Sequence, residues 1–197
     1  MKKIINKETK KLVNFLTDKQ KDLIARLEKG EYFDLRQVDD DLLFGLPAGI
    51  RQQVFLAIIE HGSGGHICSG NHYEYNVGLH DDYRLCELPE EERKLIIPKY
   101  VERCAFRGDT SLKIFEYSKE EYIPVLQVYL SKRHLPEEAW YHFIELPTEE
   151  IIEIMAHALV LSNYSPHILE DLAKLPIKLQ DEIRTQATTI ANDKKKK

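Results

Sequence analysis

Apolar residues recur at helical spacing from the start of the chain, in short stripes that polar turns separate. One stripe ends just before Thr17, and the next ends just before Gly30. Thr17 and Gln20 have the spacing of a capping box, in which each side chain bonds to the other residue's backbone amide. Gly30 supplies the left-handed residue with which many helices end. The pattern predicts two consecutive helices in residues 4–29, or one helix with a break near Thr17.

A Leu-Pro pair is the most regular feature of the rest of the chain. Proline suits the first turn of a helix, because its fixed φ is helical and its missing amide would have no partner there. The five pairs are Leu46-Pro47, Leu88-Pro89, Leu135-Pro136, Leu146-Pro147 and Leu175-Pro176. The residue seven positions after each proline is apolar, and two helical turns bring such residues to one face. These residues are Val54, Ile96, Phe143, Ile154 and Ile183. We predict a helix after each pair, with Ile154 and Ile183 buried.

Two further helices are expected, at about 119–133 and 166–174. Ser118 and Glu121 offer a capping box at the start of the first, and Ser165 precedes a proline at the start of the second. These segments add to the dense helical signal of the second half of the chain.

Two prolines lie inside helical patterns, and we expect Pro98 and Pro124 to kink or shorten their helices. Successive Leu-Pro pairs are 42, 47, 11 and 29 residues apart. This spacing is irregular for a strict repeat family, although a degenerate helical solenoid fits it. We therefore predict an all-α fold of about nine or ten short helices, as an irregular orthogonal bundle or a short α-solenoid.

Glycine marks a boundary, because all nine glycines lie between Gly30 and Gly108. The stretch 62–86 is a Gly-rich loop, in which alternating aromatic and polar residues are compatible with a small hairpin. We divide the chain into an N-terminal helical unit at 1–61, the Gly-rich loop and a connecting helix at 62–108, a Gly-free helical unit at 109–193, and a basic tail at 194–197. The helical units are expected to share one core.

The chain has 28 Lys and Arg residues against 33 Asp and Glu residues, and the two signs are segregated. Residues 1–29 carry a net charge of +5, residues 194–197 carry +4, and residues 30–193 carry −14. Because an acidic body repels phosphate, we expect no nucleic-acid partner. The longest apolar run has six residues, which favours neither a membrane span nor a signal segment. Three cysteines are a small and odd number that does not describe a disulfide framework and suits a reducing compartment, so we expect a cytoplasmic protein, with an injected effector as the alternative.

Metal binding is one hypothesis for the Gly-rich loop, because zinc takes four nitrogen or sulfur ligands. The candidate ligands are Cys68, His72 and Cys86, with His66 or Cys104 as the fourth. A Cys-His enzyme is the related alternative. Its candidate groups are Cys68 as nucleophile, His72 or His80 as base, and Asp81 or Asp82 to orient the base. No Cys-x-x-Cys pair and no His-Glu-x-x-His pattern occurs. We therefore predict no cofactor, no metal and no catalytic residue.

Aromatic residues beside acids favour a contact surface at the same loop. Tyrosine supplies a large contact area at low entropic cost, and interfaces are enriched in aromatic residues. The predicted partner-binding residues are Tyr73, Tyr75, Asp81, Asp82 and Tyr83. In a second aromatic region, Trp140 and Phe143 have a helical spacing that fits a core better than a contact. We predict a non-catalytic protein–protein interaction module, of adaptor, inhibitor, immunity or effector type, whose acidic surface binds a basic protein partner.

One helix start has a more specific pattern. It reads Leu46-Pro47-Ala48-Gly49-Ile50-Arg51-Gln52-Gln53-Val54-Phe55-Leu56-Ala57-Ile58, with apolar residues three, seven and eight positions after the proline. This pattern resembles the first helix of an F-box, and residues 146–154 look similar. The second F-box helix has no counterpart, since the Gly-rich loop follows. The resemblance implies docking to a ubiquitin-ligase adaptor through Leu46, Pro47, Ile50, Val54 and Phe55.

Overall fold

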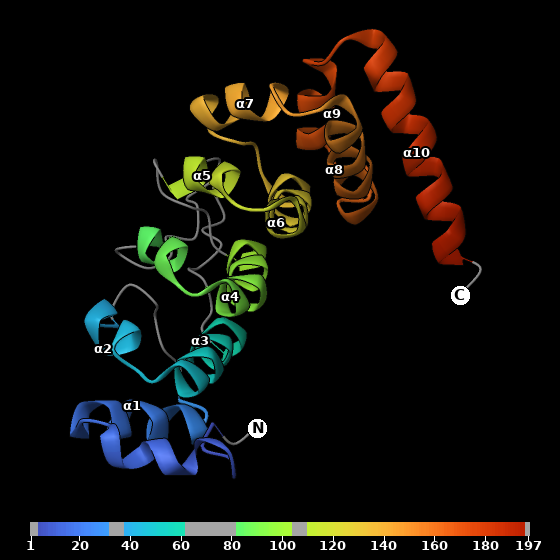
Figure 1. The fold of residues 1–197 in the computed structure, drawn as a ribbon. Coiled ribbons are helices and arrows are strands. Elements are labelled where there is room, and N and C mark those ends of the chain that lie inside the picture. Colours follow the sequence, from blue (N-terminus) through green and yellow to red (C-terminus); the bar gives the residue numbers. More distant parts are fainter. Residues whose placement is uncertain (1–3, 32–37, 62–81, 104–109, 196–197) are drawn as a thin grey trace, which may run out of the picture. The chain divides into compact units, whose positions relative to one another are not determined.

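The computed structural model describes residues 4–31, 38–61, 82–103 and 110–195. Within these ranges the chain forms ten α-helices and three 3-10 helices, and no strand (Figure 1). The prediction of an all-α fold is therefore confirmed. The chain divides into two compact units, Met1–Phe106 and Arg107–Lys197. No helix in the described ranges is long and apolar enough to span a bilayer.

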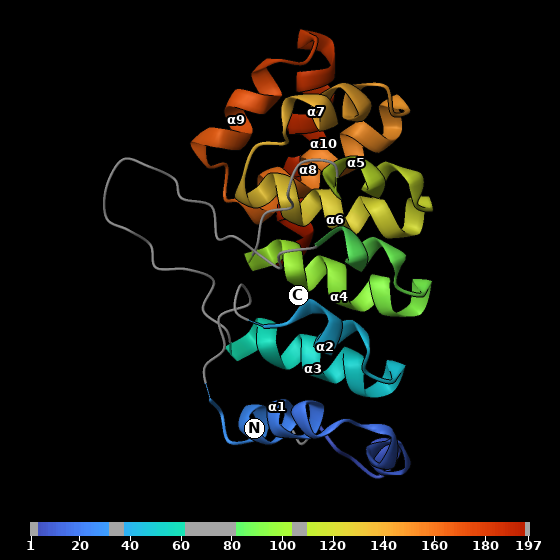
Figure 2. The ribbon, with the colours of Figure 1, turned by 90° about the vertical axis from the view of Figure 1, so that its left-hand side faces the viewer.

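The first unit consists of three long helices, each preceded by a short helix. The long helices are α1 (Asp18–Glu28), α3 (Ala48–His61) and α4 (Glu90–Arg103), and the short ones are η1 (Thr9–Phe15), α2 (Asp40–Phe44) and η3 (Asp82–Glu87). Helix α3 packs against α1 on one side and α4 on the other, so the three long helices lie in chain order (Figure 2).

The second unit has the same construction. Its long helices are α6 (Lys119–Lys132), α8 (Thr148–Leu161) and α10 (Ile177–Lys195), preceded by α5 (Thr110–Lys113) with η4 (Ile114–Glu116), by α7 (Glu137–Ile144) and by α9 (Pro166–Ala173). Helix α8 is central and packs against both α6 and α10 (Figure 1). Each unit is thus a stack of three helix pairs.

The six helix pairs follow a regular spacing that the Leu-Pro pairs hide. The residue just before each long helix is Thr17, Pro47, Pro89, Ser118, Pro147 or Pro176, and we call it the turn residue. Successive turn residues are 30, 42, 29, 29 and 29 positions apart. The irregular spacing expected from the sequence is misleading for two reasons. Threonine and serine replace proline at two turns, and Leu135-Pro136 opens the short helix α7 instead of a long one.

The core of each unit is built from equivalent positions of the helix pairs. The residue seven positions after every turn residue is buried: Ile24, Val54, Ile96, Val125, Ile154 and Ile183. The predicted burial of Ile154 and Ile183 is therefore confirmed. The short helices contribute the residue four positions before the turn residue, which is fully buried in five pairs: Leu43, Leu85, Ile114, Phe143 and Leu172. One helix face per element is enough to fill such a core.

The caps at the start and end of α1 are those that the sequence predicts. The Gln20 amide N–H donates to the Thr17 hydroxyl at 3.2 Å, and the Thr17 amide donates to the Gln20 side chain at 3.0 Å. The Gln20 side-chain amide also donates to the Leu42 carbonyl at 3.3 Å, which ties α1 to α2. Gly30 ends the helix with a φ of 80°, where a side chain would be strained.

The capping box predicted at Ser118 is wrong, and the shortening expected at Pro98 and Pro124 does not occur. Ser118 makes no side-chain cap, because its hydroxyl donates to the Glu121 carboxylate at 3.2 Å instead of accepting a backbone amide. Pro98 and Pro124 do not shorten α4 and α6, which have 14 residues each, as α8 does. Packing of the apolar face outweighs the one backbone hydrogen bond that each proline removes.

Candidate functional site

Most of the predicted partner-binding residues lie outside the described ranges. Tyr73, Tyr75 and Asp81 belong to residues 62–81, and Asp82 is described only as the first residue of η3. Tyr83 is 44% exposed, which is compatible with a contact role. The contact surface at this loop therefore stays a prediction.

Most of the predicted zinc ligands also lie outside the described ranges. Cys68, His72 and the optional fourth ligands all lie outside the described ranges. Cys86, the remaining candidate, is buried in η3. The part of the chain that the structure describes contains no group of three His, Cys, Asp or Glu side chains able to hold a metal ion.

The F-box-like helix start does not offer a docking face. Leu46, Ile50, Val54 and Phe55 are at most 2% exposed. The Phe55 ring packs edge-on against Phe44, with 5.3 Å between ring centroids. These side chains form the core of the first unit, so the docking implied by the resemblance is not carried further.

An acidic segment lies in the middle of the second unit. Residues 134–173 contain eight Asp and Glu residues and no Lys or Arg. Glu137 and Glu138 fill the first turn of α7, where the helix dipole stabilises negative charge. Glu145 and Glu149 lie in or next to the turn between α7 and α8, and all four side chains are exposed. Glu137, Glu138, Glu145 and Glu149 form no ion pair within the described residues, so they present negative charge to solvent.

Helix α7 adds exposed apolar groups to this charge. Its buried side holds Ala139 and Phe143, whereas Tyr141 is 57% exposed and Ile144 is 43% exposed. The Tyr141 hydroxyl donates to the Glu137 carboxylate at 3.3 Å, which fixes the ring beside the acid.

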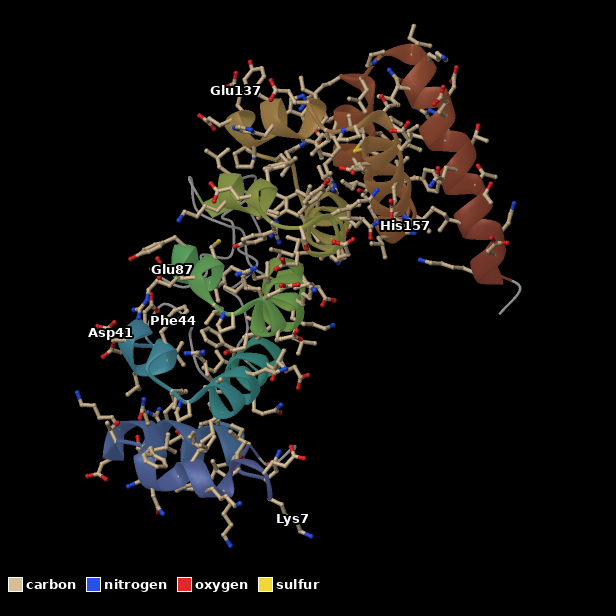
Figure 3. All side chains as sticks on the ribbon, in the orientation of Figure 1. Lys7, Asp41, Phe44, Glu87, Glu137 and His157 are labelled. Atoms are coloured by element: carbon tan, nitrogen blue, oxygen red, sulfur yellow. The ribbon has the colours of Figure 1, made fainter. Side chains whose placement is uncertain are left out.

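We call Glu137, Glu138, Tyr141, Ile144 and Glu145 the α7 face. Figure 3 shows the Glu137 side chain pointing away from the body of its unit. The core prediction for this region holds for Phe143, while Trp140 is half-buried beneath the Lys174 ammonium, 5.1 Å from its ring centroid.

A second polar cluster lies beside α9 and was not predicted from the sequence. Asp171 is fully buried, and its Oδ1 accepts from the Lys174 ammonium at 2.7 Å and contacts His134 Nδ1 at 3.0 Å. Its Oδ2 has no hydrogen-bond partner within the described residues. In the sequence, Asp171 lies one helical turn after His167. Its partner His134 is 37 residues away, so the sequence gives no local signal for that pair.

The neighbouring histidine is used differently. His167 Nε2 lies 3.0 Å from the Leu130 carbonyl, which can only accept, so this nitrogen carries the proton. His167 Nδ1 then accepts from the Ser165 hydroxyl at 2.9 Å. Leu130 is in the last turn of α6, where carbonyls lack helical partners, so His167 caps that helix.

The two polar pairs do not form a catalytic relay. In a serine-histidine-aspartate triad one histidine bonds to both other groups. Here Ser165 bonds to His167, while Asp171 bonds to His134. The arrangement joins α9 to the end of α6, and we assign it a structural role.

No family model matches the sequence, and searches of curated proteins and of solved structures found no significant match.

Proposed function

We propose that the protein is a non-catalytic protein–protein interaction module whose acidic surface binds a basic segment of a partner protein. The observation that carries the proposal is the α7 face, where exposed Tyr141 and Ile144 lie among exposed glutamates. A reducing compartment such as the cytoplasm is the proposed location, because three cysteines are too few, and odd in number, for a disulfide framework.

The composition of the α7 face favours a basic partner with an apolar centre. Tyr141 and Ile144 provide contact area that loses water on binding, which is the main source of affinity. The surrounding glutamates contribute mainly to the association rate and to the choice of partner, since exposed charges are screened and partly hydrated. A segment with alternating Lys or Arg and apolar residues meets both requirements.

The predicted loop residues remain part of the proposal. Tyr73, Tyr75, Asp81, Asp82 and Tyr83 combine aromatic and acidic groups as the α7 face does. We propose them as a second contact surface for a basic partner.

The test is capture of partners from native lysate with two matched double variants. Glu137→Lys/Glu138→Lys reverses two charges on the α7 face. Asp181→Lys/Glu182→Lys makes the same charge change at two exposed acids on α10. We expect the first pair to abolish capture and the control pair to leave it unchanged. Capture should also weaken steeply between low and high salt, because the Debye length falls from about 30 Å at 0.01 M to about 8 Å at 0.15 M.

Single alanine variants separate the two surfaces. Tyr141→Ala should weaken binding by at least about tenfold, which corresponds to a hot-spot residue. Tyr73→Ala and Tyr75→Ala apply the same standard to the loop. Equal loss in the α7 and α10 double variants would show a nonspecific charge effect and contradict the proposal, as would capture that is insensitive to salt.

A further inference from the structure

The start of the chain carries exposed residues that are predominantly basic, opposite in charge to the α7 face, with exposed Glu8 and Asp18 among them. Lys7, Lys10, Lys11 and Lys19 are exposed and form no ion pair with the described residues. Phe15, at the end of η1, is 77% exposed. Figure 3 shows Lys7 pointing away from the body of the first unit. We call the four lysines and Phe15 the η1 face.

The two faces match each other in chemistry. Each has a large exposed aromatic side chain, Phe15 in one and Tyr141 in the other. One adds four lysines, and the other adds three glutamates with Glu149 following in the next helix. Phe15 remains 77% exposed in its own unit, although full burial of such a ring is worth about 1.5–3 kcal/mol. A surface of this kind is typical of an interaction site.

We propose that the η1 face of one chain binds the α7 face of a second copy of the chain. The proposal rests on the proposed function, since it names the basic segment that the acidic surface receives. The contact is heterologous, because two different surfaces meet. After a single contact one chain keeps its α7 face free and the other keeps its η1 face free.

A second copy fits the η1 face better than a polyanion does. Nucleic acid and anionic membranes would meet the lysines but would also approach a body whose residues 30–193 carry a net charge of −14. The α7 face carries part of this negative charge beside the Tyr141 ring, which Phe15 can cover. In self-association the basic start of one chain attracts the acidic α7 face of another. A polyanion would be attracted by the basic start but repelled by the acidic body.

The experiment measures mass as a function of concentration for the full chain and for charge-reversed variants. Sedimentation velocity of the unmodified chain at low salt should show an average mass that rises above 23.0 kDa with concentration, up to about 1 mM. Lys10→Glu/Lys11→Glu and Glu137→Lys/Glu138→Lys should each stay monomeric. The controls Lys178→Glu/Arg184→Glu and Asp181→Lys/Glu182→Lys on α10 should associate as the unmodified chain does.

Mixing the two monomeric variants provides the decisive measurement. Each keeps one unmodified face, and the unmodified faces are complementary, so the mixture should associate although neither component does. A mass of 23.0 kDa at every concentration overturns the proposal. Failure of the mixture to associate also overturns the proposal, because the substitutions would then have prevented association without acting on a contact between the η1 face and the α7 face.

The outcome can be separated from that of the proposed function. A synthetic peptide of alternating lysine and leucine, titrated onto the Lys10→Glu/Lys11→Glu variant, tests the α7 face without self-association. Peptide binding with no self-association overturns only this inference. Loss of both overturns the proposed function as well.

Discussion

At the residue scale, both units use the same side-chain tie between neighbouring long helices. Glu92 lies three positions after the turn residue Pro89. It accepts two hydrogen bonds from Arg51, at 2.8 and 2.6 Å. Glu150, at the equivalent position, accepts from the Tyr122 hydroxyl. Arg51 and Tyr122 occupy equivalent positions in the preceding pair. A carboxylate at this position therefore accepts a hydrogen bond from a donor on the preceding long helix. This bond sets the position of one long helix along the other.

The Arg51–Glu92 pair predicts a large asymmetry between single and double variants. The two side chains are only 16% and 7% exposed, and Arg51 also donates to the Phe44 carbonyl at 2.9 Å. Arg51→Met leaves the carboxylate buried without its partner, so we expect a loss of about 3–5 kcal/mol in unfolding free energy. Arg51→Met/Glu92→Met should recover much of this loss. Urea titrations of both variants measure it, and additive losses would contradict the role given to the pair.

The Tyr122–Glu150 tie predicts a pH dependence in the alkaline range. Burial, and then the hydrogen bond to Glu150, raise the pKa of Tyr122 well above its ordinary value of 10.0. Folding thus favours the neutral phenol. The resulting stability is fully present below the unfolded pKa of about 10 and is lost as the pH rises above it.

Tyr122→Phe is the matched variant, because it removes the titrating group and keeps the ring. The slope of unfolding free energy between pH 9 and pH 11 should be shallower in this variant than in the unmodified chain. Identical slopes would show that Tyr122 ionises equally in both states.

At the scale of the element, each helix is defined by one apolar face and by the residue that opens it. Proline, threonine and serine all serve as the turn residue, because each supports the extended backbone that precedes a helix or its first turn. The buried position seven residues later follows from helical geometry alone. This is why the faces of the long helices could be predicted before their partners were known.

Ile154 and Ile183 test these faces directly. Both are fully buried, in α8 and α10. Truncation of either to alanine removes buried methylene groups and leaves a cavity, so we expect a loss of about 2–5 kcal/mol. Ile177→Ala is the control on α10, where the side chain is 77% exposed, and it should change stability by less than about 0.5 kcal/mol. Chemical unfolding of the three variants measures the difference, and three equal values would refute the assigned faces.

At the scale of the whole molecule, the described residues repeat one helix pair six times, three in each unit. A single spacing departs from 29 or 30 residues, the 42 between Pro47 and Pro89. The excess of 13 falls between α3 and η3, the interval that contains residues 62–81. In repeat proteins an insertion of this kind lies outside the repeated core and often carries a function.

The excess predicts that a chain lacking residues 65–77 still folds. This deletion restores a spacing of 29 between the two prolines. Since the cost of closing a loop changes only slowly with its length, we expect the free energy of unfolding to change by less than about 1 kcal/mol. Circular dichroism and urea titration check the fold. Loss of cooperative unfolding would show that these residues belong to the core, whereas an intact fold with lost partner capture would assign the loop its predicted contact role.

The candidate site was less accessible from the sequence than the fold. Trp140, Tyr141 and Phe143 lie within four residues of the sequence, yet one is half-buried, one exposed and one in the core. Helical spacing separates Tyr141 from Phe143 by about 200° of rotation, but which side faces the core depends on where α8 and α9 lie. The cluster around Asp171 was missed altogether, because it joins residues 37 positions apart.

The sequence by itself determined the all-α class, the capping of α1, the apolar face of every Leu-Pro helix and the segregation of charge. These are local properties, set by backbone geometry and by side chains within one or two helical turns. Only the tertiary structure decided which short helix pairs with which long one, which carboxylates are buried against donors, and which aromatic residues remain in solvent. Those properties depend on contacts between helices that are distant in the sequence, and a helical face specifies that something must cover it without specifying what does.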